Sequence, residues 1–579
     1  MNYKLLFFVT TSFLSLIVSS AMAQYKLSDD ASEISPLTQE YVYPVRIVWN
    51  EGDIYQLENL LEKGNGQASL KNDDAVILKN TGKDTSSILL DFGKEINGSL
   101  EIITGMWAED SPRPIRIRFG ESVSEAMSDV GEFGATNDHA MRDFELMLPW
   151  LGKNRTAETG FRFVRLDFAE PEEELHLKEV RAIFTYRDIP YLGTFKCNDE
   201  RLNKIWDVGA YTVHLNMQDF LWDGIKRDRL VWVGDLHPEV STVNTVFGYN
   251  EVVPRSLDQA RDVTPLPGWM SGISTYSMWW IIIHHDWYMA HGDLNYLQEQ
   301  KSYLQSLVRQ IVTKVKDGKE EMDGNRFLDW PSSEDPEAIH AGLQAMTIMA
   351  LEKASIISEL LEDPETQKLC DQTVASMRHY VPDFQSSKQA AALLSIANML
   401  DADVAYDQVL KIGGAQNFST FYGYYMLEAM AKAGRYEEAM DIISEYWGGM
   451  LDLGATTFWE DFNIEWIENA ARIDELVPEG KIDIHGNYGD YCYVGHRHSF
   501  CHGWASGPTA WLSEHVLGIK VTKPGGKEYK ISPHLGNLEY AEGTYPTPYG
   551  LISVKHVKNE DGSIKTEVDA PEEVNIIMQ

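Results

Sequence analysis

Cysteine is scarce in this sequence. Only four cysteines occur in 579 residues, at positions 197, 370, 492 and 501. None of them forms a CxxC pair, which excludes zinc-ribbon and thioredoxin-like motifs. A disulfide between Cys492 and Cys501 is one alternative in an oxidising compartment, but buried free thiols are expected in a chain of this size.

Positive charge is also scarce. The sequence has 50 Lys and Arg against 88 Asp and Glu, which gives a formal net charge of −38. Nucleic acids and anionic membrane surfaces attract proteins rich in Lys and Arg, so this charge argues against both as partners. After the N-terminal residues no apolar run is long enough to cross a bilayer, and we predict no membrane insertion. No feature of the sequence predicts an oligomeric state.

The first 23 residues have the pattern of a secretory signal peptide. Lys4 supplies the positive charge, residues 5–18 are apolar, and the small residues 21–23 (Ala-Met-Ala) form a cleavage site. We therefore expect residues 1–23 to be removed. The mature protein would begin at Gln24 and be secreted or periplasmic.

The rest of the chain has the composition of a large folded protein, with 44% hydrophobic and 11% aromatic residues. Its length predicts about three to four domains. Over residues 115–119 and 164–168, apolar residues alternate with charged ones, which is typical of β-strands. Asn97-Gly98 and residues 152–154 are read as turns. We predict an antiparallel β-sandwich over residues 24–190 that carries no chemistry of its own.

Residues 191–520 have helical periodicity instead. A first helix is expected after a cap at Asn198 or Asp199, and further helices at 274–291, 297–316, 337–361, 364–379, 387–400, 418–433, 435–447 and 504–517. Helical hairpins without intervening strands favour a toroid of paired helices over a βαβ fold. Residues 521–579 return to short strands at 529–532, 552–557 and 564–568, with Asp561-Gly562 as a hairpin turn.

The most unusual stretch is residues 223–235, Asp-Gly-Ile-Lys-Arg-Asp-Arg-Leu-Val-Trp-Val-Gly-Asp. It follows the first predicted helix and combines three acids, three basic residues and a tryptophan. Ionisable residues grouped on such a loop indicate either a functional site or an Arg–Asp network that closes the helix end.

The pattern Asp-Gly-x-Lys-Arg-Asp-Arg-Leu-x-Trp-x-Gly-Asp resembles the signature of the α-L-rhamnosidases, glycoside hydrolase family 78. The resemblance implies an N-terminal β-sandwich over 24–190, a central (α/α)6 barrel over 191–520 and a C-terminal β-sandwich over 521–579. It also implies inverting hydrolysis, in which one carboxylic acid protonates the glycosidic oxygen and a second carboxylate activates water.

The resemblance assigns roles within residues 223–235. Asp228 matches the general acid, at a position where the family usually has Glu. Because aspartate is shorter by one methylene group, Glu239 stays open as a competing acid. The residues that match sugar-binding positions are Asp223, Arg227, Trp232 and Asp235.

Two later segments complete the implied site. Residues 454–460 resemble the segment that carries the general base, which gives Glu460 this role. By spacing alone, Glu460 could instead occupy an early helical position behind a threonine cap. Residues 499–508 resemble a loop whose histidine contacts the sugar, here His502. Trp330 either stacks on the apolar face of the sugar or belongs to the core.

The sequence hypothesis is an exported, inverting α-L-rhamnosidase that removes terminal α-L-rhamnosyl residues from plant or algal polysaccharides or glycosides. No cofactor is expected. His496 and His498 lack the spacing of a helical metal-binding pair, so no metal is expected either. The alternatives are a catalytically lapsed sugar-binding protein, which the aspartate at position 228 would suit, and another (α/α)6 enzyme such as an unsaturated glucuronyl hydrolase or lyase.

Overall fold

The computed structural model describes residues 34–82 and 85–579, and Leu37–Gln579 form one compact unit. The predicted signal peptide, residues 1–23, lies outside the described residues, so cleavage before Gln24 stays a prediction. Within residues 34–82 and 85–579, every helix is too short or too polar to span a membrane.

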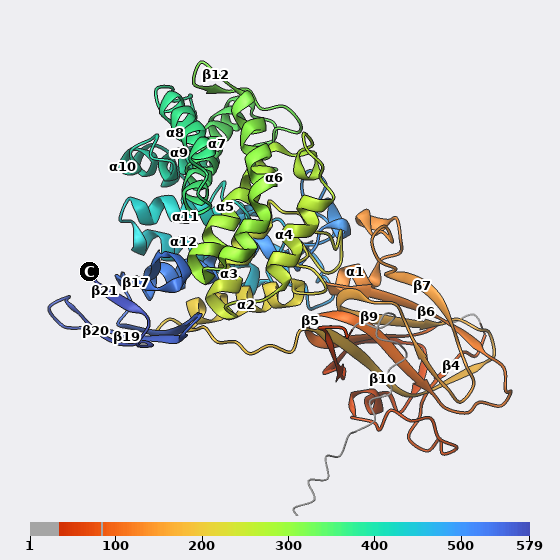
Figure 1. Ribbon diagram of the computed structural model, residues 1–579. Coiled ribbons are helices and arrows are strands. Elements are labelled where there is room, and N and C mark those ends of the chain that lie inside the picture. Colours follow the sequence, from red (N-terminus) through yellow and green to blue (C-terminus); the bar gives the residue numbers. More distant parts are fainter. Residues whose placement is uncertain (1–33, 83–84) are drawn as a thin grey trace, which may run out of the picture. The chain divides into compact units, whose positions relative to one another are not determined.

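A ten-stranded sheet forms the N-terminal region (Figure 1, orange). Its main path is β3-β4-β10-β5-β9-β6-β7, while β1 pairs with β10 and both β2 and β8 pair with β5. The strands are β1 Thr38–Val42, β2 Arg46–Glu51, β3 Asp53–Tyr55, β4 Val76–Lys79, β5 Ser86–Thr104, β6 Arg113–Gly120, β7 Asp143–Leu148, β8 Lys153–Arg155, β9 Thr159–Phe168 and β10 Glu174–Tyr186. Ile117 on β6 pairs with Leu166 on β9, and both are fully buried, as the alternation predicts.

Both predicted turns are wrong: Asn97-Gly98 lies inside the long strand β5, and Lys153 and Asn154 lie in β8, after a turn at residues 150–151. A Cβ atom at Gly98 would stand 2.2 Å from the carbonyl oxygen of Ile183 on β10. The glycine therefore serves the close approach of two paired strands and not a change of direction.

Each predicted helical segment contains a helix (Figure 1). The helices are α1 Val123–Met127 (within the β region), α2 Glu200–Asn216, α3 Leu236–Val246, α4 Val252–Asp262, α5 Ser274–His291, α6 Leu294–Thr313, α7 Pro336–Leu360, α8 Pro364–Met377, α9 Lys388–Ile396, α10 Ala402–Ala405, α11 Gly423–Lys432, α12 Tyr436–Asp452 and α13 Gly507–Trp511. Asp199 caps α2 by accepting from two backbone N–H groups, as predicted. Helices α3 and α4, which follow the charged residues 223–235, were not predicted from the sequence.

The C-terminal strands form two small sheets, β11-β18-β19-β20 and β16-β17-β21. Their strands are β11 Thr194–Cys197, β16 Ile519–Lys523, β17 Glu528–Ile531, β18 Tyr540–Thr547, β19 Gly550–Lys558, β20 Ile564–Asp569 and β21 Asn575–Met578, and two-residue strands form the pairs β12 (Val315–Lys316) with β13 (Lys319–Glu320) and β14 (Ala470–Ala471) with β15 (Ile482–Asp483). The predicted hairpin turn at Asp561-Gly562 joins β19 to β20, and Gly562 has the positive φ of 83° that this turn requires. Because β11 precedes α2, the chain enters this C-terminal sheet before the helices begin.

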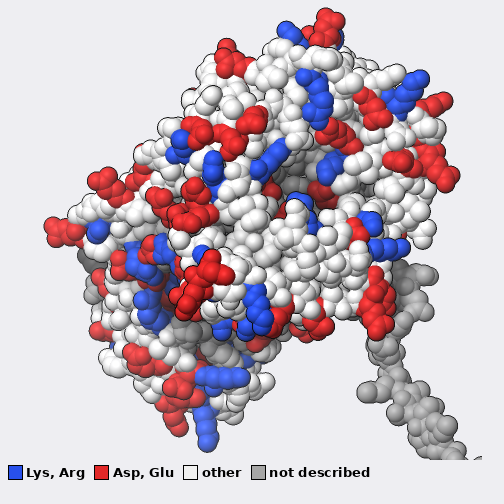
Figure 2. Space-filling model, turned by 90° about the vertical axis from the view of Figure 1, so that its left-hand side faces the viewer, with Lys and Arg blue, Asp and Glu red and all other residues white. Residues whose placement is uncertain are grey.

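Figure 2 draws one face of the surface with its charged side chains coloured. On the face drawn in Figure 2, acidic and basic side chains are interspersed, and a hollow opens among them. All four cysteines are free thiols, as expected, and no disulfide joins Cys492 to Cys501.

Candidate active site

A pocket of 290 Å³ lies where loops distant in the sequence meet. It is lined by the loop after α2, by residues 271–276 at the start of α5, by residues 325–330 ahead of α7, and by the segment between α12 and α13. All residues predicted for the site line this pocket: Asp223, Arg227, Asp228, Trp232, Asp235, Trp330, Glu460 and His502. The structure thus brings together residues that are separated by up to a few hundred positions.

The loop at residues 217–235 is fastened to the segment ahead of α13. Gly224 and His502 form an isolated β-bridge, and the Gly503 N–H donates to the carbonyl oxygen of Asp223 at 2.8 Å. Asp228 and Arg229 have φ angles of 55° and 58°, in a region that costs a non-glycine residue roughly 1–3 kcal/mol. The surrounding contacts therefore hold the loop in a strained form at Asp228.

Arg227 joins the two carboxylates predicted to do the chemistry. Its Nη2 forms a close ion pair with Oε1 of Glu460, and its Nη1 lies 3.3 Å from Oδ1 of Asp228. The indole Nε1 of Trp232 donates to Oδ2 of Asp228 at 3.0 Å. Burial lowers the pKa of Arg227, but the Glu460 carboxylate outweighs burial and raises the pKa above its ordinary value. The guanidinium therefore stays charged.

Asp223, Asp235 and His502 form a buried cluster on the same wall. The His502 Nε2 lies 3.6 Å from Oδ2 of Asp223 and 3.9 Å from Oδ2 of Asp235. Burial, and then repulsion from Asp235, raises the pKa of Asp223 well above its usual range. Burial likewise raises the pKa of Asp235 and lowers that of His502. All three groups favour their neutral forms, which offer both hydrogen-bond donors and acceptors.

Glu460 is held by the segment that precedes α13. Its N–H donates to the Ser499 carbonyl oxygen at 3.0 Å, and its Oε2 accepts from the Ser499 N–H at 3.2 Å. Its carbonyl oxygen accepts from Nε1 of Trp504 at 2.8 Å. Helix α12 ends at Asp452 and the next 3-10 helix begins at Ile464. The alternative of an early helical position for Glu460 is therefore wrong.

Trp330 lies at the rim and is partly buried. Its ring stacks on Tyr491, with centroids 5.8 Å apart, and contacts the edge of Phe327 at 5.2 Å. Trp330 packs on neighbouring aromatic rings and also lines the pocket, and its stacking on a sugar stays a prediction.

Glu239, the competing acid, lies on α3 and is fully buried. Neither of its carboxylate oxygens has a hydrogen-bond partner among the described residues. Burial, and then repulsion from Asp235 and Asp223, raises the pKa of Glu239 well above its ordinary value. A Cβ atom at Gly503 would lie 2.2 Å from its Cδ. Glu239 therefore packs behind the pocket wall, whereas Asp228 lines the pocket itself.

Three residues at the site were not predicted from the sequence. The Tyr276 hydroxyl donates to Oδ1 of Asp235 at 2.7 Å, and the ring of Tyr493 lies 5.4 Å from the Arg227 guanidinium carbon. His139, from the β region, has its Nε2 3.2 Å from Oδ1 of Asp228. None of these residues belongs to a motif, and only the folded chain brings them to the pocket.

Behind the pocket, Glu121, Glu125 and His485 place possible metal ligands within 4.8 Å of one another. The Lys226 ammonium occupies this position, at 2.9 Å from Oε2 of Glu121 and 3.3 Å from Oε1 of Glu125. Burial lowers the pKa of Lys226, but the two carboxylates raise it above its ordinary value. The group is a buried salt bridge between the β region and the loop at 217–235, and its charge arrangement does not suit a cation.

Two family models cover most of the described chain. The model of the bacterial alpha-L-rhamnosidase six-hairpin glycosidase domain matches residues 190–516, and the model of the bacterial alpha-L-rhamnosidase C-terminal domain matches residues 518–578. The chain belongs to the bacterial α-L-rhamnosidase family, glycoside hydrolase family 78.

Curated relatives of this rhamnosidase-family chain are longer than the chain itself. An alpha-L-rhamnosidase of Alteromonas sp. (strain LOR) is 24% identical over 539 residues, which cover 84% of this chain and 54% of the relative. An alpha-L-rhamnosidase of Streptomyces avermitilis is 22% identical, covering 83% of this chain and 47% of the relative. The chain spans about half the length of the curated relatives it matches.

Solved structures show the same fold. The family 78 rhamnosidase of Bacillus sp. GL1 matches with a TM-score of 0.75 at 20% identity, over 90% of this chain and 55% of that one. The rhamnosidase from Klebsiella oxytoca with rhamnose bound matches with a TM-score of 0.64 at 18% identity, over 83% and 96% of the two chains. The chain therefore has the mixed, multidomain α and β fold of the family 78 rhamnosidases.

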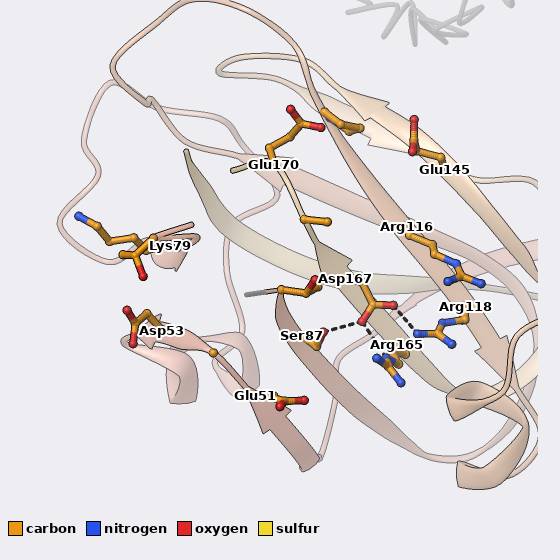
Figure 3. A pocket seen from close by; sticks show the side chains of 15 residues that line it. Glu51, Asp53, Lys79, Ser87, Arg116, Arg118, Glu145, Arg165, Asp167 and Glu170 are labelled. Carbon is orange, nitrogen blue, oxygen red and sulfur yellow. Dashed lines mark hydrogen bonds and ion pairs between the residues drawn. The ribbon is translucent and has the colours of Figure 1, made fainter. Parts of the chain in front are cut away.

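The β region of this family member contains a second and larger hollow, of 770 Å³ (Figure 3). At its floor, Asp167 accepts from Arg118 at 2.6 Å and from Arg165 at 2.7 Å. Arg116 donates twice to Asp143, at 2.8 and 2.6 Å. These arginines are committed to neighbouring carboxylates, so the hollow has the features of a structural charge network.

Proposed function

We propose that the 290 Å³ pocket is the active site of an inverting α-L-rhamnosidase, with Asp228 as general acid and Glu460 as general base. The observation that carries this proposal is the convergence of every residue matched to the family motifs on one pocket. The pocket lies at the small end of the range of ligand sites, which favours recognition of a single terminal sugar residue.

The two carboxylates have environments that suit different tasks. Glu460 is ion-paired with Arg227, which requires the carboxylate form that a general base needs. Water would attack the anomeric carbon on the face opposite the leaving group and lose a proton to Glu460. At the same time the glycosidic C–O bond would break and its oxygen would take a proton from Asp228.

The sugar would be held by the buried neutral cluster and by the aromatic rim. Asp223, Asp235 and His502 supply donors and acceptors for sugar hydroxyls in a site that excludes water, where each hydrogen bond discriminates strongly. Trp330 and Trp232 offer apolar faces for the sugar ring. A solved relative from Klebsiella oxytoca contains bound rhamnose, which supports the same sugar here.

The finer architecture is also part of this proposal. Residues 191–520 would form an (α/α)6 barrel between β-sandwiches at residues 24–190 and 521–579. The consecutive helices α2 to α13 and the six-hairpin description of the matching family model support this layout. The enzyme would be exported after cleavage before Gln24 and act on terminal α-L-rhamnosyl residues of plant or algal polysaccharides or glycosides.

The decisive test of the activity is incubation of the purified protein with an aryl α-L-rhamnoside and with rhamnose-containing polysaccharides. Proton NMR in the first minutes should show free rhamnose with inverted anomeric configuration. Initial retention would mean that one carboxylate acts as a nucleophile. Binding without release of rhamnose would identify a lapsed enzyme, and release only from an unsaturated glucuronide would identify another (α/α)6 activity.

Export has a separate test. N-terminal sequencing of protein recovered outside the cytoplasm should start at Gln24, and finding Met1 there would contradict the predicted cleavage.

A further inference from the structure

A loop of the β region reaches the carboxylate proposed as general acid. It connects a 3-10 helix at Glu132–Gly134 to β7 and carries Asp138 and His139. The His139 Nε2 lies 3.2 Å from Oδ1 of Asp228 and 3.4 Å from Oδ2 of Asp138. The side chains of His139 and Asp228 are 28% and 16% exposed, so the pair is in contact with solvent.

This loop is anchored against the wall of the pocket. The Arg497 Nε donates to Oδ2 of Asp138 at 3.3 Å, and Phe133 contacts the His496 ring with centroids 5.9 Å apart. A Cβ atom at Gly134 would stand 2.5 Å from the Val494 carbonyl oxygen. The neighbouring residues 492 and 493 line the pocket. These contacts of the loop hold His139 in place beside Asp228.

The other partners of Asp228 pose a chemical problem. Arg227 and Trp232 both direct N–H groups at its oxygens, but neither a guanidinium nor an indole gives up its proton, so neither can supply the proton that Asp228 transfers. A general acid needs that proton when substrate is bound. An imidazole nitrogen can either donate or accept, so His139 is the one neighbour in the described site that can hold the proton for Asp228.

We propose that His139 and Asp228 share one proton and that this pair, not Asp228 alone, supplies the leaving group at neutral pH. The inference rests on the proposed role of Asp228 as general acid. When the glycosidic bond breaks, its oxygen keeps the bonding electron pair and takes the single shared proton, which moves from His139 Nε2 through the Asp228 carboxyl group. The pair is left with neutral His139 and ionised Asp228, and one proton from solvent restores it.

The charged groups around His139 agree with this role. Among the described residues, those that face it are Asp138 from its own loop and Asp228 from the loop after α2. Behind them, Arg497 pairs with Asp138 and Arg227 with Asp228. His139 Nε2 thus lies within reach of two carboxylates, and each of these carboxylates also has an arginine beside it.

The test compares His139→Gln with the wild type in the full chain, using an α-L-rhamnosyl disaccharide and a dinitrophenyl α-L-rhamnoside from pH 4 to 9. Glutamine keeps an N–H donor near Asp228 but cannot take up a proton. An imidazole in water holds its second proton to about pH 6.5, against about 3.9 for an aspartic acid. We therefore expect kcat/KM on the disaccharide to fall roughly 10- to 100-fold at pH 7.5 and far less at pH 5.

Three further comparisons separate this role from a structural one. On the dinitrophenyl substrate, which needs little protonation, His139→Gln should stay within about threefold of wild type. The exposed His379→Gln should keep the wild-type pH profile. Equal losses on both substrates at every pH, or an unchanged profile on the disaccharide, would overturn the inference. If Asp228→Asn itself shows no leaving-group dependence, the proposed function fails first, which distinguishes the two failures.

Discussion

Two groups of arginine and aspartate, one in the β-region hollow and one in the pocket, use the same side chains in different ways. In the hollow, Arg118 and Arg165 both bind Asp167. Burial raises the pKa of Asp167, but Ser87 and Arg118 outweigh it and hold the pKa below its usual value. In the pocket, the only arginine lining the described wall, Arg227, is committed to Glu460 and Asp228.

The difference lies in which carboxylates are left without a cation. Asp223 and Asp235 have pKa values raised well above the usual range by burial, whereas Asp167 and Asp143 have lowered values because arginines bind them. Paired charges stabilise a fold, and buried acids without a cation are costly unless a ligand uses them. Cavity size alone would favour the hollow as the functional site, since the hollow measures 770 Å³ and the pocket 290 Å³. Charge balance is the better guide to function here.

The largest expected effect comes from removing the proposed general base. Glu460→Gln should lower kcat on every α-L-rhamnoside by about 10⁴-fold, equivalent to roughly 5 kcal/mol of transition-state stabilisation. The reason is that water activation is needed whatever the leaving group. Steady-state kinetics on aryl and disaccharide substrates check this, and a loss confined to one substrate class would contradict the assignment.

Removing the proposed general acid should have a smaller effect that depends on the leaving group. Asp228→Asn should lose about 10²- to 10³-fold on a disaccharide but less than about tenfold on a dinitrophenyl rhamnoside. Glu239→Gln is the matched control, because Glu239 is buried behind the pocket wall. If the dependence on the leaving group appears in Glu239→Gln instead, Glu239 is the acid and Asp228 only binds.

The comparison between the two groups predicts opposite results for one isosteric change. Asp235→Asn should reduce kcat/KM by roughly 10- to 100-fold, because a buried sugar contact is lost, while at pH 4 the protein stays as stable as wild type. Asp167→Asn should leave kcat/KM within about twofold but lower the free energy of unfolding by roughly 2 kcal/mol, since two arginines lose their anion. Kinetics and chemical denaturation measure both, and a loss of activity in Asp167→Asn would remove the distinction.

The smallest effect concerns pH. The pKa of Asp235 is raised in the fold, so its contribution to stability is complete below the unfolded value near pH 4 and is lost as pH rises. That of Asp167 is lowered, so its contribution is present above about pH 4 and lost as pH falls. From pH 4 to 7, Asp235→Asn should gain about 1 kcal/mol of stability relative to wild type, and from pH 4 down to pH 2 Asp167→Asn should gain a similar amount, because the wild type loses the Asp167 contribution there. Denaturation midpoints with the same sign of slope for both variants would contradict this.

Local patterns predicted much of this molecule. Periodicity gave helix α5 with its observed bounds, Ser274–His291, and Asp561-Gly562 gave the hairpin between β19 and β20. Helix α3 was missed because its first turn directly follows the charged stretch and contains Pro238. Asn97-Gly98 was wrongly predicted to be a turn. The glycine allows the close approach of a neighbouring strand, and no local pattern in the sequence reveals that contact.

The pocket residues that lie within motifs were found from the family resemblance, and the structure places them together. His139 could not be found in this way, because it lies 89 positions from Asp228 on an unremarkable loop. Its relevance comes only from tertiary contact. The same holds for Tyr276, whose hydroxyl binds Asp235.

The buried salt bridge of Lys226 with Glu121 and Glu125 bears on how this protein can be divided into fragments and engineered. The family model begins at residue 190, so a recombinant fragment starting there would look like a self-sufficient catalytic domain. Such a fragment would expose the Lys226 ammonium and leave the Phe500 N–H without the Glu121 carboxylate that accepts from it at 2.6 Å. The boundary of sequence similarity is therefore not a boundary of folding, and swapping N-terminal regions between homologues should succeed only when this carboxylate pair is carried along.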